Sequence, residues 1–351
     1  MRKSNIELLR IMCMFVIVVQ HYLSRDGIVE SYKVFDFNNN LGHFLRCLGY
    51  PSLVAFVMIS GFFLFGRGFR INRILAISIQ TLFYALLCLP IGFLCNYFSL
   101  KLAAQSVLIL LFGDQGYWYV PVYIGMCLII PFVEPYFVKC SKKQYETGLF
   151  IILTMMFIIP TYQGFNGFRE NQGVLTFVAV YLAAGYIRRF FDDFKESLGK
   201  WKIAVVFCIT WVLSYSTYPI GTFLNLKLFE KTVIGMNNIF ALVMGICMFL
   251  FFYTCDLGSS KVINTISAST FAVYLLHENP IIRELLWNRY INREKFYNSP
   301  LFIVHLMIIC ISIFGVSIII DLLLKNIYQL VFKSNMYKKI CDKIDNKLSL
   351  T

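Results

Sequence analysis

Long stretches without an Asp, Glu, Lys or Arg residue constrain this chain more than any other feature. Ten of them are long enough to consider as membrane spans, and most reach about 17–27 residues, the length that a helix needs to cross roughly 30 Å of hydrocarbon. They are residues 11–24, 47–66, 74–100, 115–133, 147–168, 171–187, 203–226, 232–255, 262–277 and 296–320. Hydrophobic residues make up 58% of the chain and charged residues 15%, which makes a soluble fold improbable. We therefore expect an all-α polytopic membrane bundle of about ten helices, because the stretches lack the short alternating pattern of a barrel.

The distribution of basic residues predicts the orientation of this bundle. Ten spans place both termini on one side, and if that side is the cytoplasm, the inner segments carry 21 of the 32 Lys and Arg residues, as the positive-inside rule requires. Membrane topology then accounts for the net charge of +13, and we expect no nucleic-acid partner. The first span is interpreted as an uncleaved signal anchor. The chain is expected to form one transmembrane domain at 1–330, followed by a basic cytoplasmic tail at 331–351.

The eleven cysteines are scattered, mostly within apolar stretches, and they show no CxxC or Cys/His ligand spacing. This pattern is typical of small buried apolar side chains rather than of a zinc site or a disulfide framework. A glycine-rich nucleotide loop is also missing from the sequence. We therefore expect no metal and no permanently bound cofactor.

Three ionisable residues at or just before the first span form the most informative group. Arg10 and His21 are separated by eleven residues, so a helix places them on one face, about 16 Å apart along its axis. Glu7 precedes Arg10 by three residues and can pair with it. This spacing suggests a cytoplasmic molecule with an anionic head at Arg10 and a reactive end at His21, a shape that coenzyme A thioesters have. Histidine suits general-base work; in the alternative interpretation, Arg10 anchors the helix by snorkelling and His21 caps its far end.

The same residues resemble a known family. The run from Asn5 to Arg10, ten intervening residues and then His21-Tyr22 look like the Arg-x10-His signature of the membrane acyltransferase 3 family. Four further segments resemble its motifs in the same order. They are Ile59-Ser60-Gly61-Phe62-Phe63-Leu64, Phe69-Arg70-Ile71-Asn72-Arg73-Ile74, Tyr117-Trp118-Tyr119-Val120, and Ala272-Val273-Tyr274-Leu275-Leu276-His277.

The resemblance implies a bacterial inner-membrane enzyme. It would move an acyl group, usually acetyl, from acyl-CoA as co-substrate to a hydroxyl of a cell-surface polysaccharide or its lipid-linked precursor, with His21 and Arg10 essential and Glu7 positioning Arg10. The partners are then acyl-CoA, a glycan or lipid-linked glycan and membrane lipid, and a homo-oligomer stays open. The rival interpretations are a transporter or flippase of a lipid-linked glycan and a non-catalytic subunit that supplies an acyl donor.

Several other residues are candidates for substrate contacts. Arg70 and Arg73, with Arg67, could clamp the phosphates of coenzyme A, or they only set the topology. Ser60 beside Gly61 could border a passage for the donor, although close helix packing explains this pair equally well.

Three aromatic or histidine side chains could lie near the acceptor. Trp118 and Tyr119 could stack on a sugar or pack beside His21, or they belong to an aromatic belt. His277 could bind the acceptor or assist His21, whereas Glu278 is expected to face about 100° away from it.

Four further polar residues receive no catalytic role. His43 is expected in an exposed loop and His305 in the last span. Glu134 and Asp321 are expected to pair with inner basic residues.

Overall fold

The computed structural model describes residues 4–25, 36–108, 116–162, 173–225 and 235–348, and the regular elements within these ranges are all helical. The principal helices are α1 (Ser4–Ser24), α2 (Phe37–Arg46), α3 (Gly49–Leu64), α4 (Ile71–Leu94), α5 (Leu100–Val107), α6 (Tyr119–Lys139), α7 (Lys142–Leu153), α8 (Ile159–Tyr162), α9 (Val174–Phe194), α10 (Lys200–Phe223), α12 (Ile239–Thr254), α13 (Lys261–Ala268), α14 (Thr270–His277), α15 (Pro280–Glu284), α16 (Arg293–Tyr297), α17 (Phe302–Lys333) and α18 (Asn335–Leu348). The all-α membrane bundle expected from the sequence is confirmed.

The number of spans differs from the ten expected. Within the described residues, eight helical segments are long and apolar enough to cross a membrane. Helix α12 is shorter, with 16 residues, so its span is not of full length by itself. The difference arises because an uncharged stretch need not be one continuous helix, as residues 262–277 demonstrate.

That stretch is divided at Ser269. Helices α13 and α14 lie on either side of this residue and have eight residues each, so neither can cross the hydrocarbon alone. Helix α14 ends at His277, and the Asn279 side chain then caps α15 by accepting hydrogen bonds from its first backbone N–H groups. The break therefore places the polar end of α14 inside the bundle, where His277 and Glu278 are fully buried.

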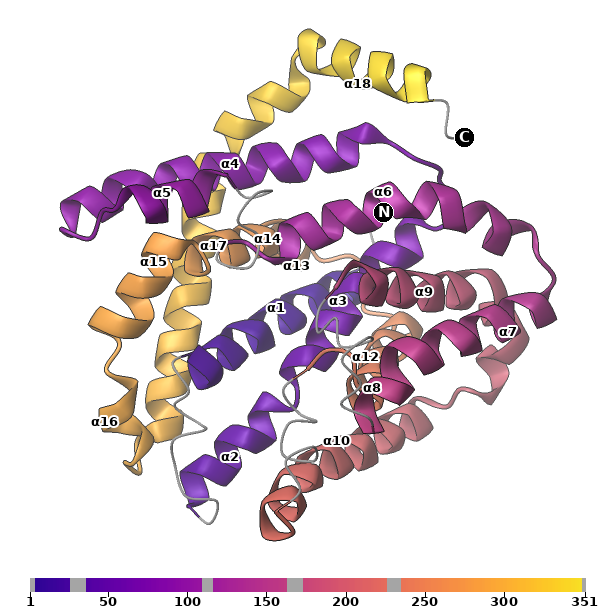
Figure 1. Ribbon diagram of the computed structural model, residues 1–351, viewed down its shortest axis with the longest axis horizontal. Coiled ribbons are helices and arrows are strands. Elements are labelled where there is room, and N and C mark those ends of the chain that lie inside the picture. The colour runs from indigo at the N-terminus through magenta and orange to yellow at the C-terminus, as the bar shows by residue number, and fades with distance from the viewer. Residues whose placement is uncertain (1–3, 26–35, 109–115, 163–172, 226–234, 349–351) are drawn as a thin grey trace.

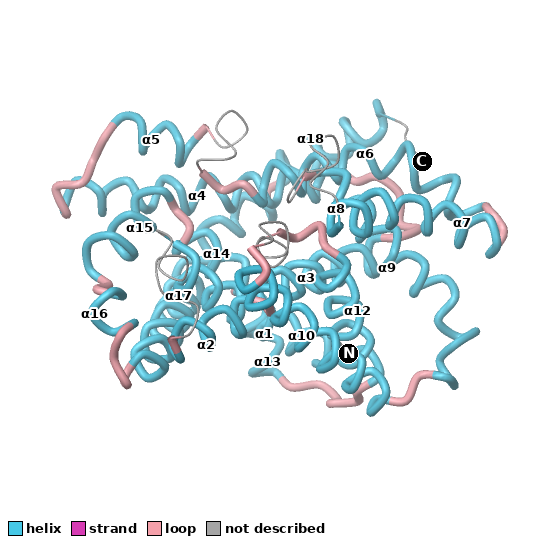
Figure 2. The backbone as a smooth tube through the Cα atoms, turned by 60° about the horizontal axis from the view of Figure 1, so that its bottom comes forward, coloured by secondary structure: helices cyan, strands magenta, loops and turns pink. Residues whose placement is uncertain are grey.

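Two shorter helices lie between the expected spans. Helix α2 lies between the first and second of these spans, and α5 follows the third. Helices α5, α15 and α16 lie at one end of the bundle, whereas α7 lies at the other (Figures 1 and 2).

Helix α3 occupies the middle of the bundle. It packs against α1, α9 and α12, and α1 and α3 are surrounded by the other helices (Figure 1). A Cβ atom added to Gly61 would lie 3.0 Å from the Cβ of Ala184 and 3.1 Å from the Cα of Tyr181, both on α9. Gly61 thus allows α3 and α9 to pack closely, as small residues do in membranes.

Residues 335–348, within the segment expected to be a basic tail at 331–351, fold back onto the bundle. Helix α18 follows α17 and contacts α4 (Figure 1). The backbone N–H of Ile71, at the start of α4, donates to Asp345 at 2.8 Å, and the Tyr337 hydroxyl donates to the Asn72 side chain at 2.5 Å. The end of the chain therefore covers the beginning of α4.

We expect Gly61→Val to destabilise the protein by about 1–3 kcal/mol, because the added methyl groups have no space between α3 and α9. The matched control is Gly315→Val on α17, where a Cβ would meet nothing within 4 Å. Thermal unfolding of the purified proteins in one detergent measures both changes. Equal unfolding temperatures for the two variants would contradict the packing role of Gly61.

Candidate active site

Two histidines from distant parts of the sequence meet at the centre of the site. His21 lies in the last turn of α1, and His277 is the last residue of α14. Their Nδ1 and Nε2 atoms are 2.9 Å apart and their ring centroids are 5.1 Å apart. The side chain of His21 is 12% exposed, whereas His277 is buried, so His21 is the more accessible member of the pair.

The hydrogen bonds of His277 determine how the pair carries its protons. Nδ1 of His277 lies 2.6 Å from the carbonyl oxygen of Val273. A carbonyl only accepts, so Nδ1 of His277 carries the hydrogen and, in the neutral ring, Nε2 is an acceptor. Nδ1 of His21 must then donate to it. This assignment, inferred from the network, leaves Nε2 of His21 with a lone pair, as a general base requires.

A buried carboxylate stands beside the histidine pair. Oε1 of Glu278 is 3.3 Å from Nδ1 of His21. The Arg25 guanidinium donates to Oε2 of the same carboxylate, and Arg283 is 4.0 Å from it. These cations compensate a charge that would otherwise be costly to bury. The carboxylate can in turn stabilise a positive charge that develops on His21.

The expectation that Glu278 faces away from His277 is therefore wrong. A rotation of 100° per residue holds only within a helix, and α14 ends at His277, with Glu278 as its C-cap at φ −97° and ψ 2°. Two signals in the sequence could have identified the site. One is the His-Glu-Asn-Pro run at 277–280, and the other is Arg25, four residues after His21.

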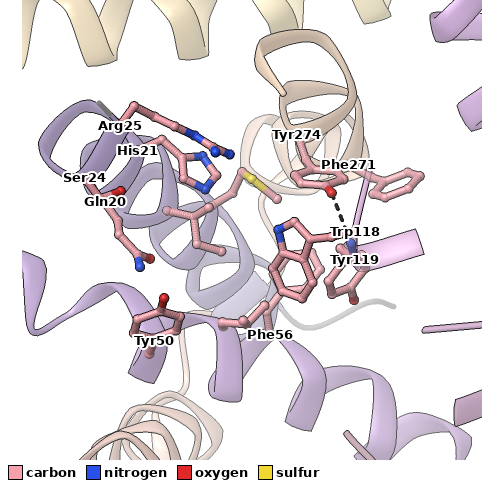
Figure 3. Close-up of a pocket in the computed structure, with 13 residues that line it drawn as sticks. Gln20, His21, Ser24, Arg25, Tyr50, Phe56, Trp118, Tyr119, Phe271 and Tyr274 are labelled. Carbon is pink, nitrogen blue, oxygen red and sulfur yellow. Dashed lines mark hydrogen bonds between the residues drawn. The ribbon is translucent and has the colours of Figure 1, made fainter. Parts of the chain in front are cut away.

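A cavity of about 200 Å³ opens beside His21 (Figure 3). Trp118 and Tyr119 line it at the start of α6, together with Phe56 from α3 and Tyr274 from α14. The backbone N–H of Tyr119 donates to the Tyr274 hydroxyl at 3.2 Å, which joins α6 to the helix that carries His277. Aromatic and aliphatic side chains, with the polar residues Gln20, His21, Ser24 and Arg25 of α1 and its end, therefore line a space that can hold a small acyl group.

Glu7 and Arg10 form the pair expected from their spacing. Nη1 of Arg10 is 2.8 Å from Oε2 of Glu7. Glu7 is buried and also accepts a hydrogen bond from the Ser267 hydroxyl on α13. It thus fixes the Arg10 side chain and ties α1 to α13. Arg10 also interacts electrostatically with Tyr119 on the cavity wall.

The remaining candidate donor contacts divide into two places. Arg73 interacts electrostatically with Tyr123 on α6, and Ser60 makes a side-chain hydrogen bond to the same tyrosine. The Tyr123 ring stacks on Tyr119 with centroids 5.8 Å apart, so Arg73 and Ser60 lie along the face of α6 that leads to the cavity. Arg70 is elsewhere: it is exposed and pairs with Asp345 of α18 at 3.7 Å.

Two expectations about other polar residues are wrong. His43 is not in an exposed loop; it is buried in α2 and stacks on Tyr218 with ring centroids 3.5 Å apart. Glu134 and Asp321 are held by tyrosine hydroxyls rather than by basic residues. Tyr181 donates to Glu134, and both Tyr84 and Tyr328 donate to Asp321. A buried phenol neutralises no charge, but it gives a hydrogen bond to Oδ1 of Asp321 and to Oε1 of Glu134. Oδ2 of Asp321 is buried without a hydrogen-bond partner among the described residues.

His305 lies in the last span, as expected, and has a structural partner. Its Nδ1 is 2.7 Å from the Tyr22 hydroxyl, and its ring stacks on Phe296. These contacts join α17 to the residue that follows His21.

The spacing of His21, His277 and Glu278 also has the form of a possible metal site. One ligand atom from each of the three residues lies within 4.8 Å of the others. However, the two histidine nitrogens already share a hydrogen bond, and Arg25 and Arg283 surround the carboxylate. Two neighbouring cations oppose the binding of a third. The arrangement therefore favours a chain of hydrogen bonds over a bound cation.

Fold and site together define a polytopic membrane protein with a partly exposed histidine beside a cavity. The family model of the acyltransferase 3 family, described as an acyltransferase domain, matches residues 3–322. The chain therefore belongs to the acyltransferase 3 family and is a membrane acyltransferase, and the resemblance seen in the sequence motifs is confirmed. The same comparisons find no match among curated proteins and none among solved structures.

Replacement of His277 tests the hydrogen-bond chain. We expect His277→Phe to lower acyl transfer by about 10²–10⁴-fold, the range of general-base effects, because Nδ1 of His21 loses its acceptor. His277→Gln keeps an acceptor and should retain more activity than His277→Phe. Acyl-CoA consumption by equal amounts of folded protein measures the difference, and equal activities of the two variants would contradict an orienting role.

Proposed function

We propose that the protein is a membrane O-acyltransferase that moves an acyl group, most simply acetyl, from acyl-CoA to a hydroxyl of a cell-surface polysaccharide or its lipid-linked precursor in a bacterial inner membrane. The observation that carries this proposal is the lone pair that the hydrogen-bond network assigns to Nε2 of His21, on the wall of the cavity. A hydroxyl is a weak nucleophile until a base removes its proton. His21 is placed to be that base.

The donor is proposed to reach the cavity along α1 and α6. Arg10 lies eleven residues before His21 on α1, about 16 Å along the axis. Arg10 and Arg73 interact electrostatically with successive tyrosines on one face of α6, Tyr119 and Tyr123. Guanidinium groups suit the phosphates of coenzyme A, and the stacked tyrosines offer an apolar surface to the pantetheine arm. Arg70 would join this set only after leaving Asp345.

The reaction balances with the residues present. Nε2 of His21 takes the proton of the acceptor hydroxyl, and the hydroxyl oxygen attacks the thioester carbonyl carbon. The new carbon–oxygen bond forms, the carbon–sulfur bond breaks, and the imidazolium returns the proton to the leaving thiolate of coenzyme A. Glu278, 3.3 Å from Nδ1 of His21, stabilises the imidazolium between these steps. Transfer through an acylated His21 or Ser60 is the alternative route, and it would give ping-pong kinetics.

Membership in an acyltransferase family weighs against a transporter or flippase. Two roles of the chain are compatible with this membership. The chain completes the transfer to the acceptor, or it passes the acyl group to a partner enzyme. The purified protein distinguishes them, because a non-catalytic donor subunit would bind acyl-CoA without acylating a glycan. The ordered chain of hydrogen bonds from Val273 to His21 favours transfer within this chain.

Acetyl-CoA binding to the purified protein should weaken by about tenfold or more in Arg10→Ala, since a charge-assisted contact to phosphate is lost. Arg10→Lys keeps the charge and should recover part of the affinity. Isothermal titration calorimetry in detergent measures the three dissociation constants. If folded wild-type protein binds no acyl-CoA, the proposed donor is wrong.

Substitution of the base gives a separate prediction. His21→Ala should abolish acyl transfer while acetyl-CoA binding stays within about threefold of the wild type, because His21 contacts the reacting end and not the phosphates. The readouts are product formation by mass spectrometry and the binding titration above. Transfer retained in His21→Ala would remove His21 from the mechanism.

A further inference from the structure

A second, larger cavity adjoins the one that contains His21. It has a volume of about 670 Å³ and lies between the end of α1, helix α5 and helix α15, at the end of the bundle where α5 and α15 are neighbours (Figures 1 and 2). Ser24 and Arg25 line both cavities. The two cavities therefore meet at these two residues, beside His21.

Basic side chains dominate the charge of this larger cavity. Arg25, Lys101 and Arg283 line it, against a single carboxylate, Glu284, among the described lining residues. The carboxylate of Glu284 accepts a hydrogen bond from the Asn288 side chain at 2.6 Å. Lys101 is exposed and makes no ion pair with any described residue. Glu278 pairs with Arg25 and Arg283, so three cations and two carboxylates lie in or beside the cavity, which leaves a net charge of +1 towards a ligand.

Membrane topology does not account for these cations. The orientation proposed from the sequence places 11 of the 32 basic residues on the outer side, the side that the positive-inside rule leaves poorer in Lys and Arg. Three of these 11 line one cavity. Their gathering there, next to a reactive histidine, is the arrangement expected of a binding site.

The hydrogen-bonding groups of the cavity point to the same ligand chemistry. Trp287 lines it and is 3% exposed, yet its indole N–H has no acceptor among the described residues. Nε of Arg25 is also buried without a hydrogen-bond partner there. Lysine, arginine and tryptophan side chains offer donors and no acceptor. A ligand that satisfies them must be rich in acceptor oxygens.

We propose that this cavity binds the acceptor through an anionic group, a carboxylate or a phosphate, that lies close to the hydroxyl to be acylated. The inference rests on the proposed function and adds the substrate class: an acidic sugar or a sugar phosphate rather than a neutral glycan. Lys101 and Arg283 hold the anion. Arg25, shared by both cavities, directs the neighbouring hydroxyl towards His21.

Three small sugars test the proposal by ligand-observed NMR with the purified protein in nanodiscs. D-Glucuronate and glucose 1-phosphate carry the two anionic groups, and glucose is the neutral counterpart. We expect at least one anion to bind about tenfold more tightly than glucose, the gain from one charge-assisted contact. Preference for glucuronate indicates an acidic sugar, and preference for glucose 1-phosphate indicates a phosphate-bearing precursor.

Single substitutions assign that preference to the cavity. Lys101→Gln should reduce anion binding severalfold, and Glu284→Gln should increase it, because the first removes a positive charge and the second a negative one. Lys295→Gln is the matched control: Lys295 is exposed on α16 and does not line the cavity. Its binding should equal that of the wild type.

Two results overturn the proposal. The first is a failure of the predicted preference. Either folded wild-type protein binds all three sugars equally or not detectably, or Lys101→Gln binds the anion as well as the wild type does. The second is binding of adenosine 3′,5′-bisphosphate, the head of coenzyme A, that Lys101→Gln abolishes, since the cavity would then hold the donor. Acetyl-CoA binding separates this failure from a failure of the proposed function. If Lys101→Gln binds acetyl-CoA normally and Arg10→Ala binds it weakly, the proposed function stands although the acceptor proposal is wrong.

Discussion

The burial of one carboxylate, Glu278, is the constraint on which the site depends. A charge at membrane depth is expensive unless other groups compensate it. Here the compensation comes from Arg25 at the end of α1 and from Arg283 on α15. The same ion pairs that make Glu278 tolerable therefore fix the distance between α1 and α14. They also bring His21 to His277, and they place a guanidinium where two cavities meet.

The sequence predicted the fold class, and it predicted some of the site. Charge-free stretches indicate a membrane bundle because lipid admits few alternatives. Polar or amphipathic residues near the ends of apolar spans are conspicuous in a sequence. For this reason the sequence predicted four residues of the site: His21, His277, Trp118 and Tyr119. The structure places these four residues at or beside one cavity.

The other parts of the site could not be predicted from the sequence, because they depend on where helices end and on which helices are in contact. The break at Ser269 and the end of α14 at His277 leave no mark in hydropathy, yet they turn Glu278 toward His21. Arg70 lies on the expected basic loop, but its contact is a carboxylate more than 270 residues further along the chain. Periodicity describes faces within one helix and says nothing about partners brought from such distances.

The wide separation of the two histidines has a consequence for how the enzyme comes into being. His21 and His277 are 256 residues apart in the chain. A ribosome that synthesises the protein from its N-terminus delivers α1 to the membrane long before α14 exists. Throughout that interval His21 lacks the acceptor that orients its ring, and Arg25 lacks its carboxylate. The pair of histidines is thus incomplete in the growing chain, and it forms only when most of the bundle has been inserted.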